Sequence, residues 1–137
     1  GGKIAILAVW PMVQLAEQAA EVLAKEGICP KIVNARFIKP LDEEMLMSLA
    51  KERYHLITVE EASAAGGFGS AVLEFYAQHA MDEVAVRIVG IPDMFIEHGN
   101  VNEQRQEAGL TVDRIISEVR AMLPLIQQQA KAKAAGK

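Results

Sequence analysis

The residues best suited to chemistry stand where an apolar run ends in two adjacent glutamates. Residues 56–59 are followed by Glu60 and Glu61, after which small residues and glycines lead into a helical pattern. A carboxylate pair can serve general acid and base catalysis. Neighbouring residues of a strand point to opposite faces, however, so at most one of the two would serve a given site. We interpret one as a buried, hydrogen-bonded carboxylate and the other as a surface charge.

The turn after the glutamates could bind an anion, because backbone N–H groups at the start of a helix attract negative charge. Its spacing fits neither common phosphate motif: no Gly-Lys-Ser/Thr is present, and Val72 stands where the last glycine of a dinucleotide fingerprint would be. Glycines also allow tight turns and close helix packing, and Glu60 and Glu61 would repel an anion. A structural role is therefore favoured, with anion binding as the alternative. The candidate residues are Gly66, Gly67, Phe68, Gly69 and Ser70.

Two further side chains invite a functional interpretation. His98 stands in an irregular and unusually apolar loop, residues 90–99, where it could be an acid, a base or a polar contact with a partner. Neither His55 nor His79 lies at metal-ligand spacing from it, so we expect no metal site. Arg36 could bind an anion, although a salt bridge within its own loop is favoured. No Ser/His/Asp or Cys/His set can be assembled, and these residues alone specify no reaction.

Composition limits the class of protein. The 137 residues fit one domain, and a chain that is 51% hydrophobic but only 5% aromatic predicts an aliphatic core. A net charge of −4 argues against a nucleic-acid surface. The single cysteine, Cys29, excludes an internal disulfide and is expected to be a buried structural thiol. No apolar run is long enough to cross a bilayer, which predicts no membrane contact and a cytoplasmic protein. A start at Gly1 rather than methionine suggests a fragment or a processed chain.

Strand and helix patterns alternate along the chain and must position these residues. Apolar runs predict strands over residues 4–9, 31–35, 56–59 and 84–89. Amphipathic patterns predict helices from Met12 to a Gly27 stop, from an Asp42 cap to about Arg53, and from the glycine-rich turn to Ala80. Two more are expected, over residues 100–109 and 111–123. We predict a three-layer α/β/α domain over residues 3–123, with a mostly parallel sheet of four or five strands, and a frayed or disordered tail over residues 124–137.

Four segments, in this order, resemble the C-terminal domain of 1-deoxy-D-xylulose-5-phosphate synthases. They are residues 34–42, 58–61, 66–72 and 90–99, and the likeness covers roughly residues 3–123. The Arg36, Pro40-Leu41-Asp42 and Glu60-Glu61 elements are shared with transketolases and with the beta subunits of 2-oxo acid dehydrogenases. The loop from Ile91-Pro92-Asp93 to Glu97-His98-Gly99 favours the synthase. Trp10-Pro11 stands where that family usually has a glycine, and Asn34 where it usually has an aspartate.

The resemblance implies a transketolase-type transferase that uses thiamine diphosphate and Mg²⁺ to decarboxylate pyruvate and join the two-carbon unit to glyceraldehyde 3-phosphate. Its product feeds isoprenoid, thiamine and pyridoxol synthesis. In such enzymes the cofactor and the metal sit between two preceding domains, and this chain lacks their Gly-Asp-Gly motif. The resemblance therefore implies no catalytic, cofactor-binding or metal-binding residue in this fragment.

The expected role of the domain is to support the upstream catalytic domains and a homodimer. The residues expected to make that contact are Asp93, Phe95, Ile96, Glu97 and His98. One alternative is a regulatory module that binds an anion or nucleotide at the glycine-rich turn. Another is the C-terminal domain of a transketolase or of a 2-oxo acid dehydrogenase beta subunit.

Overall fold

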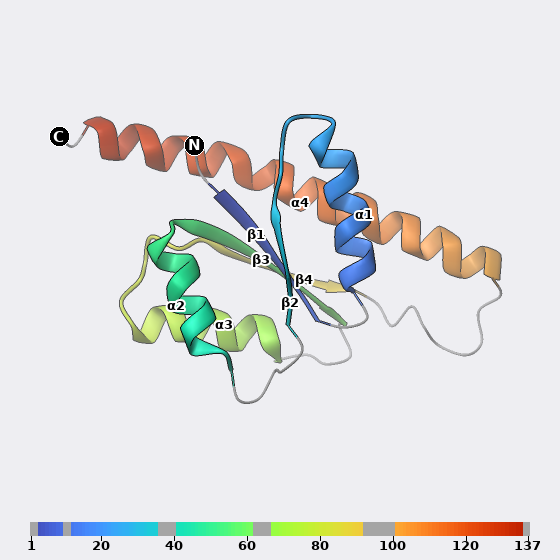
Figure 1. Cartoon of the computed structure of the whole chain (residues 1–137), viewed down its shortest axis with the longest axis horizontal. Helices are drawn as coiled ribbons and strands as arrows, with labels where there is room; N and C mark the ends of the chain where they lie inside the picture. The colour runs from blue at the N-terminus through green and yellow to red at the C-terminus, as the bar shows by residue number, and fades with distance from the viewer. Residues whose placement is uncertain (1–2, 10–11, 36–40, 62–66, 92–100, 136–137) are drawn as a thin grey trace.

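The computed structural model describes residues 3–9, 12–35, 41–61, 67–91 and 101–135, in which strands and helices alternate (Figure 1). The strands are β1 (Lys3–Ala8), β2 (Lys31–Asn34), β3 (Tyr54–Glu61) and β4 (Val86–Ile91). The helices are α1 (Val13–Ala24), α2 (Glu43–Lys51), α3 (Phe68–Gln78) and α4 (Val101–Ala135). The strands form a four-stranded sheet in the order β2-β1-β3-β4, and every neighbouring pair is parallel. The predicted α/β class with a parallel sheet is confirmed.

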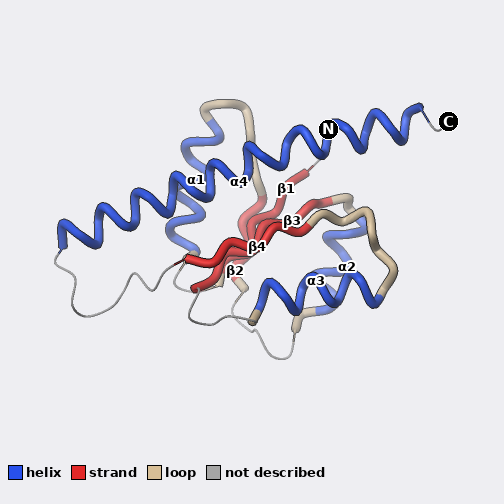
Figure 2. Tube along the Cα trace, turned by 180° about the vertical axis from the view of Figure 1, so that it is seen from behind, coloured by secondary structure: helices blue, strands red, loops and turns tan. Residues whose placement is uncertain are grey.

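Helices cover both faces of this sheet, which gives three layers (Figure 2). Alternate residues of β1 serve the two faces, as a pleated strand requires: Ile4 and Ile6 pack in one cluster, and Ala5 and Leu7 in the other. The first cluster includes residues of α1 and α4, and the second includes residues of α2 and α3. β1 and β3 are thereby buried on both sides, which explains their nearly continuous apolar sequences.

Two local signals in the sequence act as expected. The Asp42 side chain caps α2 by accepting a hydrogen bond from the Met45 N–H at 3.1 Å. Gly27 adopts φ +79° just after α1, and the Ile28 N–H donates to the Leu23 carbonyl at 3.0 Å. This arrangement reverses the chain into β2, and glycine suits its left-handed backbone.

The last helix differs from the prediction. A break at Gly109, a new cap at Thr111 and an end near Leu123 were expected, whereas α4 is one helix that runs through Pro124 to Ala135. The Thr111 hydroxyl donates back to the Glu107 carbonyl at 2.9 Å, one turn earlier, instead of capping a new helix.

The packing of α4 explains this continuity. A stripe along the helix is buried in the same cluster as α1, and it consists of Ile115, Ile116, Val119, Met122 and Ile126. Because Ile126 belongs to it, the core extends past the boundary predicted at residue 123. Tertiary packing of one face thus sustains a helix through a glycine and a proline that disfavour it locally.

Cys29 also departs from the prediction, since it is exposed rather than buried. It lies in the connection between α1 and β2, where its neighbour Ile28 packs against the core. Among the described helices, none combines the length and the apolar composition needed to cross a bilayer.

Candidate functional site

The carboxyl end of β3 holds a buried carboxylate that the start of α3 binds. Glu60 is only 6% exposed. Its Oε2 accepts a hydrogen bond from the Phe68 N–H at 2.9 Å, and its Oε1 accepts one from the Gly69 N–H at 3.1 Å. The prediction that one of the two glutamates is a buried, hydrogen-bonded carboxylate is confirmed, whereas Glu61 is half-buried rather than fully at the surface.

The strand explains why Glu60 reaches this position. Side chains alternate along β3, so Glu60 points to the same face as Leu56 and Thr58, the face that α3 covers. The first N–H groups of a helix have no partner within the helix and carry its positive dipole end. Glu60 supplies both a hydrogen-bond acceptor and a negative charge at that point. An external anion would therefore have to compete with a carboxylate of the protein itself.

Gly69 permits the close approach of α3 to the sheet. A Cβ at this position would lie 2.7 Å from the Thr58 Oγ1 and 2.7 Å from the Ile88 Cγ2, far inside contact distance. Thr58 is fully buried, and its hydroxyl oxygen has no hydrogen-bond partner among the described residues. Gly69 thus serves close packing, the structural role that the sequence favoured for the glycines.

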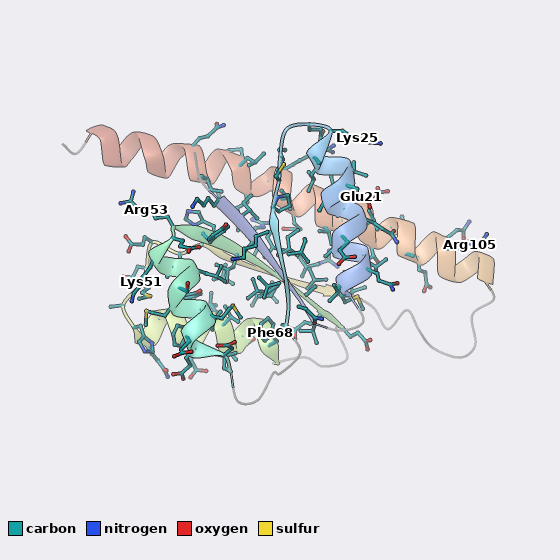
Figure 3. All side chains as sticks on the ribbon, in the orientation of Figure 1. Glu21, Lys25, Lys51, Arg53, Phe68 and Arg105 are labelled. Atoms are coloured by element: carbon teal, nitrogen blue, oxygen red, sulfur yellow. The ribbon has the colours of Figure 1, made fainter. Side chains whose placement is uncertain are left out.

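The remaining candidates of the glycine-rich turn have different surroundings. Phe68, labelled in Figure 3, is buried in the cluster beneath α2 and α3, and Ser70 is exposed on the first turn of α3. Gly67 is half-buried and precedes the helix. Gly66 lies outside the described residues. Two of the N–H groups expected to bind an anion are therefore already hydrogen-bonded to Glu60.

The other predicted site residues also lie outside the described part of the chain. They are Arg36, Asp93, Phe95, Ile96, Glu97 and His98, and the Trp10-Pro11 departure from the family pattern lies outside it as well. Their segments each follow the last residues of a strand, and all four strands are parallel. The chain therefore enters each of these segments from the same edge of the sheet, the edge at which open parallel sheets place their ligands and contacts.

The amino end of the sheet holds groups that the sequence did not single out together. His55 is buried, and its Nδ1 accepts a hydrogen bond from the Ala85 N–H at 3.0 Å. Burial lowers the pKa of His55, because a charged imidazolium is poorly solvated there. On the other face of the sheet, at the preceding residue of β3, the Lys3 and Lys31 ammonium groups lie 5.3 and 5.5 Å from the centre of the Tyr54 ring. These residues are distant in sequence, so only strand pairing brings them together.

No group of three or more His, Cys, Asp or Glu residues in the described ranges is arranged to hold a metal ion. The groups described above are the Glu60 carboxylate bound by α3, the buried His55 imidazole and two exposed lysines near Tyr54. Nothing in this set forms a nucleophile with an adjacent base.

The described residues form a three-layer α/β/α domain with a parallel sheet, in which Glu60 of β3 binds the first N–H groups of α3. A sequence profile of the family described as "Transketolase, C-terminal domain" matches residues 1–115, and the chain belongs to that family. This finding confirms the superfamily suggested by the Arg36, Pro40-Leu41-Asp42 and Glu60-Glu61 elements.

Within this family, the most informative comparison is with relatives that share one name. The chain is 54% identical over 125 residues to a protein of Brevibacillus brevis named 1-deoxy-D-xylulose-5-phosphate synthase, which covers 91% of this chain and 20% of that protein. It is 47% identical over 130 residues to a protein of the same name from a Geobacillus species, covering 95% of this chain and 21% of the relative. The chain thus spans about a fifth of the length of these relatives.

A solved structure described as "Split gene transketolase, inactive beta4 tetramer" is similar in fold. Its TM-score is 0.62 at 29% sequence identity, and the likeness covers 85% of this chain and 40% of that one. The predicted resemblance to the synthase family and the predicted transketolase-type fold are both confirmed.

Proposed function

We propose that this chain is the C-terminal, non-catalytic domain of a 1-deoxy-D-xylulose-5-phosphate synthase. The whole enzyme condenses pyruvate with glyceraldehyde 3-phosphate and releases CO₂, supplying precursors of isoprenoids, thiamine and pyridoxol in the cytoplasm. The observation that carries the proposal is the 54% identity, over 91% of the chain, to a relative of that name. Relatives of the same name from other organisms support it at 42% to 47% identity.

The described residues do not fit thiamine diphosphate or its Mg²⁺. The helix start best suited to a diphosphate, that of α3, already binds the Glu60 carboxylate, whose charge opposes a second anion. We therefore assign the cofactor, the metal and the catalytic residues to the part of the enzyme that precedes this domain. No step of the reaction is assigned to a side chain of the present chain.

The role left for the domain is to support the catalytic domains of its own chain and a homodimer. The segment from Asp93 to His98 is the proposed contact, and it follows β4 at the carboxyl edge of the sheet. Apolar side chains such as Phe95 and Ile96 suit a buried interface, and His98 can add a polar contact.

Activity measurements test the assignment. The full-length protein is expected to release CO₂ from pyruvate in the presence of glyceraldehyde 3-phosphate, thiamine diphosphate and Mg²⁺, whereas the 137-residue chain alone is expected to release none. A full-length protein without this activity would contradict the enzyme assignment. Turnover of pyruvate by the isolated chain would contradict the non-catalytic role.

The contact is tested by the oligomeric state of the full-length protein. Phe95→Asp is expected to weaken the dimer at least about tenfold, because a carboxylate is costly to bury in an apolar interface. Leu110→Asp is the matched control, since Leu110 is already 69% exposed on α4. Equal dimer dissociation constants for the two variants, measured by analytical ultracentrifugation, would contradict the proposed contact.

The alternative is a regulatory module that binds an anion or nucleotide at Gly66 to Ser70. It requires the ligand to displace Glu60 from the Phe68 and Gly69 N–H groups or to use other groups of the turn. Calorimetric titration with phosphate and nucleotides separates the two proposals. Tight binding that is lost in Gly67→Val would support the regulatory role, and the absence of binding would favour the supporting role.

A further inference from the structure

β4 stands last in the strand order, so one of its long sides has no neighbouring strand in the described sheet. On its other side, the Leu56 N–H of β3 donates to the Ala85 carbonyl at 2.8 Å. Backbone groups of successive residues in a strand point to opposite sides, so those of Val86, Ile88 and Gly90 point away from β3. We call this row the outer side of β4. Such a row of N–H and C=O groups is a template for another strand.

One side chain of the domain already uses this row. The Arg114 guanidinium of α4 donates to the Gly90 carbonyl at 2.8 Å, which agrees with the outward direction of that group. Among the described residues, no other side chain or strand forms a hydrogen bond with the outer side of β4. The outward N–H and C=O groups of Val86 and Ile88 therefore lack a partner in this part of the chain.

Apolar side chains border the row on the face that α3 covers. Ile88 is 42% exposed, and Leu73 of α3 is 47% exposed. A Cβ on Gly69 would lie 2.7 Å from the Ile88 Cγ2, so the first turn of α3 lies directly against β4. Leu73 follows one helical turn after Gly69, on the same side of the helix. The two exposed side chains thus form an apolar strip beside the unpaired backbone groups.

The opposite face of β4 carries a charge that is already paired. Arg87 points to the face that α4 covers, and its guanidinium forms an ion pair with Glu118 of that helix. The two helices lie on opposite faces of the sheet (Figure 2). A second copy of β4 would bring the same neutral pair, so Arg87 does not oppose the approach of one copy to another.

The outer side of β4 is also complementary to itself. When two copies of β4 lie antiparallel with Ile88 opposite Ile88, Val86 of each lies opposite Gly90 of the other, and outward groups meet outward groups at every pair. Gly90 has no side chain, which leaves room for Val86. On the same face, the exposed Ile88 side chains of the two copies meet, flanked by Leu73 of each. A two-fold axis makes the two contributions identical.

We propose that β4 pairs antiparallel with β4 of a second copy of this chain, about a two-fold axis at Ile88, so that the two sheets become one. The inference deepens the homodimer of the proposed function and rests on that part of it. β4 leads in sequence into the segment from Asp93 to His98, the contact proposed above. Strand pairing adds backbone hydrogen bonds to that contact and assigns no step of the reaction to this domain.

Disulfide trapping in the full-length protein tests the pairing. Opposite residues of a hydrogen-bonded antiparallel pair have Cα atoms about 5.5 Å apart, which suits a disulfide. Ile88→Cys is therefore expected to link two chains at least about tenfold faster than Val22→Cys. Val22 is the matched control because it is 40% exposed, on α1. Both variants carry Cys29→Ser, since Cys29 is exposed, and mass spectrometry identifies the linked peptides. Equal rates of linkage would overturn the proposal.

A charge on the axis tests the same contact without a covalent bond. Ile88→Lys places two ammonium groups opposite each other at the centre of the paired strands, and lysine on an edge strand disfavours pairing. We expect the dimer dissociation constant, measured by analytical ultracentrifugation, to rise at least about tenfold. Val22→Lys makes the same change at a similarly exposed residue and should leave the constant unchanged. Equal constants for the two variants would contradict the pairing.

The same preparations keep this inference separate from the proposed function. A dimer that forms without the link at position 88 would overturn the strand pairing and leave the homodimer supported, because another segment or another protein would then cover β4. A monomeric full-length protein would contradict the homodimer and the pairing together. A link at position 88 in a protein that releases no CO₂ from pyruvate would contradict the enzyme assignment and leave the pairing supported.

Discussion

At its carboxyl end, β3 places the Glu60 carboxylate in the interior, where two N–H groups of α3 satisfy it, whereas at its amino end Tyr54 lies near the surface beside two lysines. Both ends carry charged groups, and at the carboxyl end the described residues supply both the carboxylate and the N–H groups that bind it. A helix start that already binds a carboxylate has little attraction left for another anion, which supports a structural role for Phe68 and Gly69. At the amino end, the two lysines are exposed and lie near the Tyr54 ring from neighbouring strands.

Gly69→Val is expected to lower the free energy of unfolding more than any other substitution considered, because it disrupts the packing of α3 on the sheet. The new side chain would overlap Thr58 and Ile88, so α3 must move off the sheet. We expect a loss of about 3 kcal/mol in the free energy of unfolding, measured by urea denaturation. Gly109→Ala is the control: a Cβ there meets nothing within 4 Å, and the better helix former should add about 1 kcal/mol. Equal effects at the two glycines would contradict the close approach.

Glu60→Ala removes the internal anion and leaves the Phe68 and Gly69 N–H groups without their partner. We expect a loss of about 2 kcal/mol, the cost of unsatisfied buried donors. Glu61→Ala, at the half-buried neighbour, should cost less than about 0.5 kcal/mol. Urea denaturation of Glu60→Ala and Glu61→Ala compares the two losses in the free energy of unfolding. A similar loss for both would mean that Glu60 does not hold α3 in place.

Thr58→Val should act in the opposite direction. The Thr58 hydroxyl is fully buried and has no hydrogen-bond partner among the described residues, so a methyl group in its place removes a desolvated polar atom. We expect a gain of about 1 kcal/mol in the free energy of unfolding. A loss of stability in the same urea assay would show that the hydroxyl has a partner in the folded protein.

The smallest effect is expected at the amino end, from His55. Because burial lowers the pKa of His55 in the folded state, the unfolded chain binds the proton more readily, with a pKa near 6.5. The contribution of neutral His55 is therefore fully present above pH 6.5 and is lost as the pH falls from there through the folded-state pKa. Unfolding measured at about pH 7.5 and about pH 5 should show this decline, and His55→Gln should reduce it. An unchanged pH profile in His55→Gln would contradict the assignment.

Much of the fold followed from local chemistry. The alternation of apolar runs with amphipathic segments predicted the parallel sheet and its helical layers, and Asp42 predicted the start of α2. The expectation of one buried glutamate was also correct, because a carboxylate at the end of a buried strand needs hydrogen bonds. The predicted break at Gly109 was wrong, since the local preferences of a glycine and a threonine were outweighed by the apolar stripe of α4 packing on α1.

The sequence by itself determined the class of domain and its family, because periodicity and short motifs depend only on neighbouring residues. It did not determine which N–H groups bind Glu60, how closely Gly69 approaches Thr58, or that Lys3, Lys31 and Tyr54 share one surface. Those contacts join residues from 8 to 51 positions apart, and strand order, register and helix packing alone bring them together. The tertiary structure therefore decided that the carboxylate near one end of β3 is bound inside the domain, whereas the lysines near its other end are exposed.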